Sequence, residues 1–352
     1  MQGSSVEHDR PAVRRGVDGG VPTVAILIPV ATRAKILTPQ AERHLAGFAH
    51  IRTPTGEGVS EEDLPGLLDG AVACLTGWGT PPLGKAVLDE QATLRLVAHT
   101  AGSIRRLVPM EAVERGLRVS HAAPIIADAV AEFVVCQSLL GLRSLHEIDR
   151  AMKAGGEWHD LRERYLGRLL GAQTVGVIGA GYVGRTVIRL LTAFGATVLV
   201  YDPLLSDEAA TALGTALRPL DQLFGESQVV TLHAPVLPET RGMVGAEQLS
   251  RLRDGALFIN TARAALVDEA ALLREVQGGR ITAALDVFEH EPLPADSPFR
   301  GLPNVILSPH AAGHTVDTYH RQGAAMVDEI SRLVRGEPLR YEISAAMLPS
   351  MA

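Results

Sequence analysis

Cysteine and basic residues are scarce in this sequence. Only two cysteines, Cys74 and Cys136, occur among 352 residues, and their spacing fits neither a disulfide framework nor a zinc site. We therefore expect no metal centre and a reduced, cytoplasmic setting. Lys and Arg number 33 against 40 Asp and Glu, a net charge of −7, and no basic block stands out. Nucleic acids and membranes are not expected partners, because anionic surfaces attract clustered positive charge.

Long hydrophobic runs are missing near the start of the chain, where an export signal would lie. The apolar stretch Val24–Val30 is far shorter than the roughly 20 residues that a spanning helix needs. It contains Pro29 and follows Arg14-Arg15, but it fits a first strand better than a twin-arginine signal. Residues 1–20 are polar and rich in glycine, and we expect them to form a flexible tail.

The rest of the sequence alternates short apolar runs with longer segments of helical period. The runs predicted to be strands are Thr23–Ile28, Ala71–Thr76, Leu94–His99, Thr174–Ile178, Thr197–Tyr201, Val229–His233, Ala256–Asn260, Thr282–Val287 and Val305–Ser308. This alternation predicts an α/β fold with two Rossmann-like or flavodoxin-like domains, each a doubly wound parallel sheet. Between the two series, residues 127–154 are predicted to form one long helix that ends at Gly155-Gly156.

A glycine pattern follows the first strand of the second series. Gly179, Gly181 and Gly184 form G-x-G-x-x-G between that strand and a helical segment, whose N-terminus can bind a pyrophosphate. Gly179 would make the turn, Gly181 would let the phosphates approach, and Gly184 would let the helix pack on the strand. Asp202 ends the next strand and can accept the adenosine ribose hydroxyls, which disfavours the extra phosphate of NADP. The predicted cofactor is NAD(H).

Three polar clusters follow later strands, where ligands bind in open α/β sheets. They supply Arg263, Glu291 and His310, which suit hydride transfer to a 2-keto acid. Arg263 can polarise the ketone and bind a carboxylate through its planar guanidinium. Protonated His310 can donate to the carbonyl oxygen, and Glu291 can orient its ring and stabilise its charge. Taken singly, each residue has a simpler interpretation: Arg263 as a loop cation, Glu291 as a solvated acid and His310 as a cap. The three together favour a catalytic role.

These motifs resemble those of the D-isomer-specific 2-hydroxyacid dehydrogenase family, which includes phosphoglycerate dehydrogenases and glyoxylate/hydroxypyruvate reductases. The resemblance runs from about Leu94 to Asp328 and includes Ala123-Pro124, Val130-Ala-Glu132 and Leu232-His-Ala-Pro235. It implies that Arg263, Glu291 and His310 are the catalytic residues. The implied cofactor contacts are Gly179, Gly181, Tyr182, Val183, Gly184, Asp202, His233, Ala234, Pro235, Thr240, Thr261, Ala262, Arg263, Asp286, His310, Ala312 and Gly313.

The resemblance also implies how the chain is organised. A substrate domain would combine residues 21–121 and 315–352, with an NAD-binding domain, residues 122–314, inserted between them; domain closure would exclude water. The substrate carboxylate would bind backbone amides of a loop containing Thr100, Ala101, Gly102 and Ser103. A homodimer formed through the long helix is expected on the same grounds.

Three departures from the family pattern concern the substrate. Ala264 replaces the usual Gly after the catalytic Arg, Ile104 replaces an Asn, and His314 replaces a small hydroxyl residue. We hypothesise that Arg105 or Arg106 contacts a second anionic group of the substrate, against the simpler interpretation of a solvated helix start. We also hypothesise that Trp78 forms an apolar wall of the substrate pocket.

The favoured function is therefore NAD-dependent interconversion of a small anionic 2-keto acid and the (R)-2-hydroxy acid. Two alternatives stay open. Formate and phosphite dehydrogenases resemble the same family and differ in substrate. An NAD(H)-sensing regulator, similar to the C-terminal-binding co-repressors, would share the fold but show negligible turnover.

Overall fold

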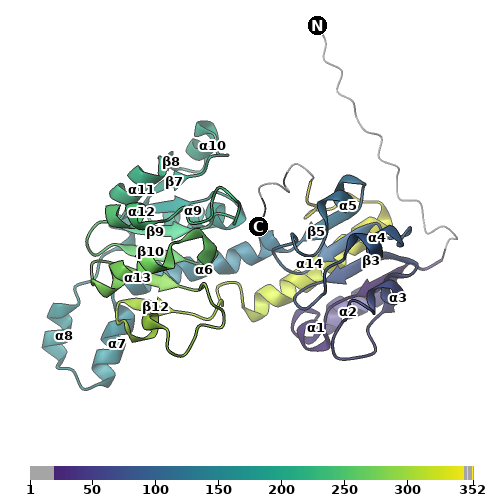
Figure 1. Ribbon diagram of the computed structural model, residues 1–352, viewed down its shortest axis with the longest axis horizontal. Helices are drawn as coiled ribbons and strands as arrows, with labels where there is room; N and C mark the ends of the chain where they lie inside the picture. The colour runs from purple at the N-terminus through teal and green to yellow at the C-terminus, as the bar shows by residue number, and fades with distance from the viewer. Residues whose placement is uncertain (1–19, 345–346, 348–350, 352) are drawn as a thin grey trace, which may run out of the picture. The chain divides into compact units, whose positions relative to one another are not determined.

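The computed structural model describes residues 20–344, 347 and 351, and these divide into two compact units (Figure 1). The described residues up to Ala123, together with Tyr319–Met347, form the first unit, and Pro124–Thr318 form the second. The second unit is therefore an insertion within the chain of the first. The flexible tail predicted for residues 1–20 lies outside the described residues, except for Gly20.

The first unit is built on a five-stranded parallel sheet of order β2-β1-β3-β4-β5, the flavodoxin-like arrangement. Its strands are β1 (Thr23–Ile26), β2 (His50–Arg52), β3 (Ala71–Thr76), β4 (Leu96–His99) and β5 (Arg118–His121). Its helices are α1 (Val30–Ile36), α2 (Pro39–Ala46), α3 (Leu64–Leu68), α4 (Lys85–Asp89), α5 (Met110–Glu114) and most of α14 (Val316–Arg335). Met326, Ile330 and Leu333 of α14 pack on one face of this sheet, so a helix from the end of the chain completes a core begun near its start.

The second unit contains a seven-stranded parallel sheet of order β12-β11-β10-β9-β6-β7-β8. Its strands are β6 (Thr174–Ile178), β7 (Thr197–Tyr201), β8 (Ala216–Leu217), β9 (Val229–Leu232), β10 (Leu257–Asn260), β11 (Thr282–Leu285) and β12 (Val305–Leu307). The first six have the 3-2-1-4-5-6 order of dinucleotide-binding folds, and the order reverses between β6 and β9. The sequence prediction of an α/β fold with two doubly wound parallel sheets is confirmed.

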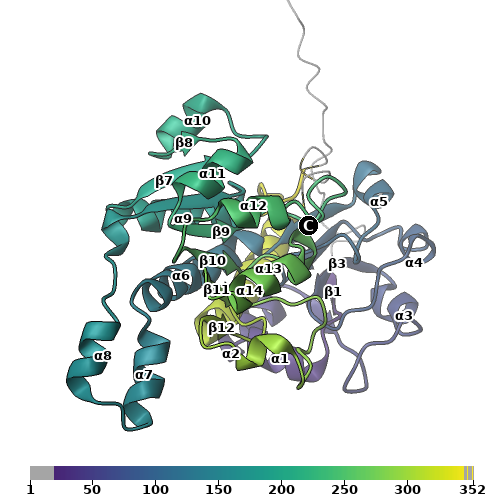
Figure 2. The ribbon, with the colours of Figure 1, turned by 60° about the vertical axis from the view of Figure 1, so that its left-hand side comes forward.

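Helices cover both faces of the seven-stranded sheet (Figure 2). The helices of this unit are α6 (Ala123–Leu142), α7 (Leu145–Lys153), α8 (Trp158–Arg164), α9 (Tyr182–Ala193), α10 (Asp207–Ala212), α11 (Leu220–Glu226), α12 (Ala246–Arg251) and α13 (Glu269–Gln277), of which α7 and α8 do not pack on the sheet. One core cluster joins the sheet to α11, α12 and α13, and the other joins it to α6, α9 and α10. Neighbouring residues of β10 alternate between these clusters, because successive side chains of a strand point to opposite faces.

Three details of the sequence prediction are wrong or incomplete. The single long helix predicted for residues 127–154 is two helices, because Ser144 adopts a left-handed conformation (φ 46°) between α6 and α7. Two strands of the first unit, β2 and β5, were not predicted. The two-residue strand β8 was also missed. Strand β2 is short with an exposed first residue, and β5 ends in Ser120-His121, so neither is a continuous apolar run.

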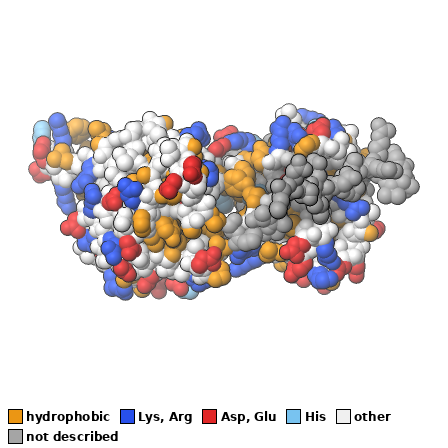
Figure 3. Space-filling view, turned by 90° about the horizontal axis from the view of Figure 1, so that it is seen from above, with side chains coloured by type: hydrophobic (Ala, Val, Ile, Leu, Met, Phe, Trp, Pro, Cys, Tyr) orange, Lys and Arg blue, Asp and Glu red, His pale blue; other side chains and the backbone are white. Residues whose placement is uncertain are grey.

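Among the described residues, one helix, α6, is long and apolar enough to cross a membrane. About 56% of its apolar window is buried in the protein, and Val130, Ala131 and Val134 contribute to the core cluster shared with α9. A mostly buried core helix can have the same length and composition, so these two properties are weak evidence for a membrane span. On the face drawn in Figure 3, acidic and basic side chains are interspersed with apolar ones.

Candidate functional site

The glycine loop lies between β6 and α9, at the carboxyl edge of the seven-stranded sheet. Gly179 has φ 93°, and a Cβ there would lie 2.8–2.9 Å from the backbone of His233 and Ala234. A Cβ at Gly184 would overlap the carbonyl oxygen of Gly179, whereas one at Gly181 would meet nothing within 4 Å. Two glycines thus serve packing and the third leaves open space at the helix N-terminus, as the sequence pattern requires for a phosphate site.

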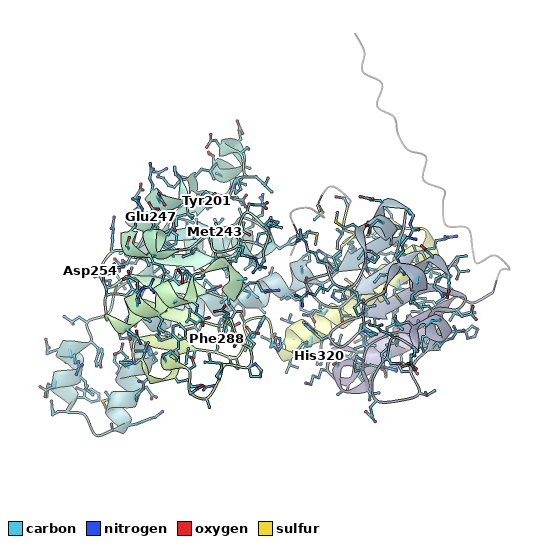
Figure 4. All side chains as sticks on the ribbon, viewed as in Figure 1. Tyr201, Met243, Glu247, Asp254, Phe288 and His320 are labelled. Atoms are coloured by element: carbon cyan, nitrogen blue, oxygen red, sulfur yellow. The ribbon has the colours of Figure 1, made fainter. Side chains whose placement is uncertain are left out.

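Asp202 lies beside the glycine loop because β6 and β7 are neighbours. Its carboxylate accepts hydrogen bonds from the backbone N–H of Ala180 (2.6 Å) and Leu204 (2.8 Å). The Gly179 N–H donates to the carbonyl of Tyr201, which ends β7 and is labelled in Figure 4 (2.8 Å). These bonds fix the carboxylate at the end of β7, beside the glycine loop, where the sequence predicts the adenosine ribose of NAD.

The turn after β10 carries Arg263 and is fixed by Asn260. The Asn260 side chain accepts from the N–H of Ala262 (3.0 Å) and donates to the carbonyl of Arg263 (3.2 Å). The Arg263 guanidinium donates to the carbonyl of Ala262 (2.6 Å), and the residue is exposed. The surrounding protein lowers the pKa of Arg263, while Glu291 acts in the opposite direction. An arginine remains charged at neutral pH under such shifts.

Within the described residues, the Thr261 hydroxyl is buried and has no hydrogen-bond partner. Buried polar groups normally have a partner, so an orphaned hydroxyl at this edge fits a ligand. Together with the open space at Gly181, it agrees with a dinucleotide at the carboxyl ends of β6 and β10. The residues present therefore fit NAD.

His310 and Glu291 form a hydrogen-bonded pair at the same edge of the sheet. His310 Nδ1 lies 2.8 Å from Glu291 Oε2, and the other carboxylate oxygen accepts from the backbone N–H of Phe288, labelled in Figure 4 (3.0 Å). The two side chains are 45% and 38% exposed, so substrate can reach them. Burial raises the pKa of Glu291, but hydrogen bonds from His310 and Phe288 and the charges of His310 and Arg263 outweigh it and lower the pKa.

The loop that carries His310 is shaped by Asp286, which is 1% exposed. The Asp286 carboxylate accepts from the Ser308 hydroxyl (2.5 Å) and from the N–H groups of Ala311 (2.8 Å) and Ala312 (3.0 Å). The His310 N–H donates to the Asp286 carbonyl (2.8 Å), and His310 has φ 53°. Residues other than glycine rarely adopt this conformation, so the buried carboxylate holds the histidine in a backbone geometry it would otherwise leave.

The remaining predicted cofactor residues occupy the same edge. After β9, His233 pairs with the Thr231 hydroxyl through Nε2 (2.9 Å), and burial lowers the pKa of His233. Thr240 closes the loop through Ala234 and Pro235, since its hydroxyl donates to the carbonyl of Pro235 (2.6 Å). The others are Tyr182, which is 41% exposed, Val183, which packs on the α6–α9 cluster, and Gly313, where a Cβ would lie 2.9 Å from Ile126.

Apart from Arg263 and His310, the predicted substrate residues lie in the first unit. Thr100, Ala101, Gly102 and Ser103 follow β4, and Arg105 and Arg106 are exposed just beyond them. Trp78 follows the neighbouring strand β3, is 39% exposed and packs edge-on against Tyr319 with ring centroids 5.7 Å apart. A Cβ at the adjacent Gly77 would lie 2.5 Å from the Thr100 hydroxyl, so the Trp78 turn and the loop are in close contact.

Sequence reasoning missed the polar residues that support these groups. Asn260, Ser308 and Tyr319 are three of them, and His99 and His121 beneath the 100–103 loop are two more. Asn260 and Ser308 lie inside the clusters that the sequence singled out, so their position at strand ends was an available signal. His99 likewise ends a predicted strand, whereas His121 and Tyr319 carry no comparable signal.

Comparison with known proteins agrees with this geometry. The NAD binding domain of the D-isomer specific 2-hydroxyacid dehydrogenase family matches residues 135–312. A glyoxylate reductase of Korarchaeum cryptofilum is 34% identical over 262 residues, which are 73% of this chain and 78% of that protein. A D-3-phosphoglycerate dehydrogenase of Archaeoglobus fulgidus is 34% identical over 266 residues, 75% of this chain, but the chain spans only 49% of that relative.

Solved structures extend the similarity over most of the chain. A phosphoglycerate oxidoreductase from Rhizobium etli superposes with a TM-score of 0.77 at 28% identity, over 91% of this chain and 97% of that one. The family match, the identity to the glyoxylate reductase and the shared fold lead to one conclusion. The chain belongs to the D-isomer specific 2-hydroxyacid dehydrogenases, a family of NAD-binding oxidoreductases of 2-hydroxy acids.

Proposed function

We propose that this protein reduces a small 2-keto acid to the (R)-2-hydroxy acid with NADH, and catalyses the reverse reaction with NAD. The observation that carries the proposal is the His310–Glu291 pair, 2.8 Å apart, on the sheet edge that also bears Arg263. NAD(H), when bound, supplies or accepts the hydride. The glycine loop, Asp202 and Thr261 would hold it. The carboxylate of Asp202 disfavours the 2′-phosphate of NADP.

The proposed roles of the side chains follow from their hydrogen bonds. A carboxylate only accepts, so His310 Nδ1 carries a proton that it donates to Glu291 Oε2. This leaves His310 Nε2 to give a proton to the ketone oxygen during reduction and to take it back from the alcohol. Arg263 would bind the 2-keto acid through charge-assisted hydrogen bonds and polarise its carbonyl group.

The test is NADH oxidation, followed by absorbance, against a panel of 2-keto acids that includes phosphorylated and dicarboxylic members. His310→Gln should abolish turnover while NADH binding, followed by its fluorescence, stays close to wild type. His290→Gln is the matched control, since this exposed histidine lies in the same loop as Glu291 and has no proposed role. Tight NADH binding without turnover on any 2-keto acid would instead favour the NAD(H)-sensing regulator.

We further propose that the substrate bears a second anionic group, bound by Arg105 or Arg106. Both side chains are exposed directly after the loop of residues 100–103. Changing each to Ala should raise KM for phosphorylated or dicarboxylic 2-keto acids more than for glyoxylate. Equal KM values in all variants would contradict this proposal. Trp78, beside the same loop, is proposed to form an apolar wall of the substrate pocket, and Trp78→Ala should change the preference among substrate side chains.

A cytoplasmic homodimer is the proposed assembly. Helices α7 and α8 lie apart from the seven-stranded sheet in Figures 1 and 2 and expose large apolar side chains, including Leu145 (53%) and Trp158 (63%). Exposed apolar surface of this kind marks protein interfaces. Light scattering should give twice the chain mass, and Trp158→Glu should shift it toward the monomer; a wild-type monomer would contradict the proposal.

A further inference from the structure

In the loop of residues 100–103, the carbonyl groups of Ala101 and Gly102 accept hydrogen bonds from the rest of the first unit. The N–H and hydroxyl of Thr100 both donate to the carbonyl of Thr76 (2.8 and 2.9 Å). The carbonyl of Ala101 accepts from the N–H of Ala122 (3.1 Å). Among the described residues, the amide N–H groups of Ala101 and Gly102 donate no hydrogen bond. Beyond Thr100, the loop is therefore tied to the protein through carbonyl oxygen atoms.

His121 holds the next carbonyl of this loop. It ends β5, is 1% exposed, and places Nδ1 3.1 Å from the carbonyl oxygen of Gly102. Because a carbonyl only accepts, Nδ1 carries the proton. Burial lowers the pKa of His121, while the bond to Gly102 acts in the opposite direction. The ring is therefore a neutral donor at neutral pH.

His99 supports the loop from its other end. It ends β4, is 4% exposed, and its Nδ1 lies 3.0 Å from the hydroxyl of Thr76. Burial lowers the pKa of His99 to about 4, assisted by His121, whereas a hydrogen bond to the backbone of Ser103 raises it. A backbone bond that favours the protonated ring must run from the imidazole N–H to a carbonyl. His99 thus donates to the Ser103 carbonyl and accepts from the Thr76 hydroxyl.

These bonds determine the direction of the loop amides. In a trans peptide the C=O of one residue and the N–H of the next point in opposite directions. Fixing the carbonyls of Ala101, Gly102 and Ser103 on the protein side therefore turns the following N–H groups, those of Gly102, Ser103 and Ile104, away from it. Successive backbone N–H groups that point the same way form an anion-binding site. The Ile104 side chain is 2% exposed and buried in the unit, so the backbone is left to do the binding there.

We propose that His99 and His121 are positioning residues that hold the 100–103 loop carbonyls inward and so present its amides to the carboxylate of the substrate. The inference rests on the proposed reduction of a 2-keto acid. It assigns a function to two buried histidines that do not touch the substrate. Both rings are buried, and they orient the backbone through hydrogen bonds.

The experiment compares His121→Leu, which removes the donor, with His121→Asn, whose side-chain nitrogen sits at the same distance along the chain as Nδ1. Thr93→Val is the matched control. It deletes a side-chain bond to the carbonyl of Ala71 (3.0 Å) at the opposite end of the same sheet. We measure kcat and KM for glyoxylate at saturating NADH, the Kd of NADH, and hydrogen exchange of the amides of residues 100–105. The same exchange is measured with oxamate, an unreactive isostere of a 2-keto acid.

His121→Leu should raise KM about tenfold or more, because the buried Gly102 carbonyl loses its donor and the loop amides lose their fixed direction. It should leave kcat within about threefold and the Kd of NADH unchanged, consistent with uniform substrate binding. Exchange in residues 100–105 should accelerate, with loss of protection by oxamate. His121→Asn and Thr93→Val should remain close to wild type. If His121→Leu does not fold, His121→Gln replaces it, because the extra methylene moves the donor away from Gly102.

The inference is overturned if His121→Leu keeps the wild-type KM and loop exchange. It is equally overturned if His121→Asn is as impaired as His121→Leu, since the ring would then act through packing alone. A wild-type protein that reduces no 2-keto acid refutes the proposed function instead. In that case, unchanged loop exchange in His121→Leu would also refute the positioning role, and accelerated exchange with lost oxamate protection would support it.

Discussion

The glycine loop permits a prediction in which two neighbouring substitutions separate folding from cofactor binding. Gly184→Ala places a methyl group against the carbonyl of Gly179, 2.9 Å from its carbon and overlapping its oxygen. Helix α9 must then move away from β6, in a unit whose core includes Val187 and Ile188 of that helix. Overpacking costs about 1–3 kcal/mol, and we expect a cost of about 3 kcal/mol here because backbone is the obstacle.

Gly181→Ala should behave differently. Its φ is −74°, and a Cβ there meets nothing within 4 Å, so the substitution should not destabilise the fold. The methyl group instead occupies the space that the pyrophosphate needs. A hydrogen bond to a charged group is worth about 1.5–3 kcal/mol, so the Kd of NADH should rise about 10- to 100-fold.

Thermal unfolding and NADH fluorescence titration distinguish the two effects, with Gly225→Ala as the control. Gly225 lies in α11, with nothing within 4 Å of a Cβ, and Ala is favoured over Gly in a helix by roughly 0.5–1 kcal/mol. Gly184→Ala should lower Tm by about 6–12 °C, given about 2–4 °C per kcal/mol in a unit of this size. Wild-type NADH affinity in Gly181→Ala would refute the placement of the pyrophosphate. A Tm for Gly184→Ala equal to that of Gly225→Ala would refute the packing argument.

Three further predictions concern buried polar groups. Asp286→Asn should reduce 2-keto acid turnover at least about tenfold in steady-state assays. The substitution replaces one carboxylate oxygen, which accepts from the N–H of Ala311 or Ala312, with an amide nitrogen that donates. Unchanged turnover would contradict the role of Asp286 in shaping the His310 loop. Glu329→Gln should lower Tm and speed proteolysis near Tyr341. The buried Glu329 carboxylate accepts hydrogen bonds from the Ser120 hydroxyl (2.6 Å) and from the N–H groups of Arg340 and Tyr341 (2.8 and 3.0 Å). An unchanged digestion pattern would contradict this role of Glu329. Acidification should destabilise the first unit, because the pKa of His99 is about 4 in the folded protein and 6.5 in the unfolded chain. As the pH falls through 6.5, only the unfolded chain gains the proton. About 3 kcal/mol should be lost by pH 4, read from urea midpoints, and His99→Asn should flatten this dependence.

Local sequence patterns predicted the elements that carry the chemistry. Glycine spacing located the turn at Gly179, and apolar runs of four to six residues located the buried strands that end beside Asp202, Arg263 and His310. Such signals are local, since a positive φ or a buried strand demands particular residue types within a few positions. Strands β2 and β8 were missed because an edge strand is held by its neighbour rather than by an apolar run of its own. The helix break at Ser144 was missed because the nearby Gly141 lies within α6, and positions 142–145 contain neither glycine nor proline.

Sequence alone thus determined the class of fold, the family resemblance and the residue types at the strand ends. Tertiary structure decided which buried polar group holds which part of the backbone. Asp286 binds the N–H groups of Ala311 and Ala312, and His121 binds the carbonyl of Gly102, across 25, 26 and 19 positions of the chain. No local pattern encodes these pairs, because they form only when parallel strands bring their carboxyl ends to one edge and exclude water there. Burial then makes each hydrogen bond obligatory, and the loops take the shapes that those bonds allow.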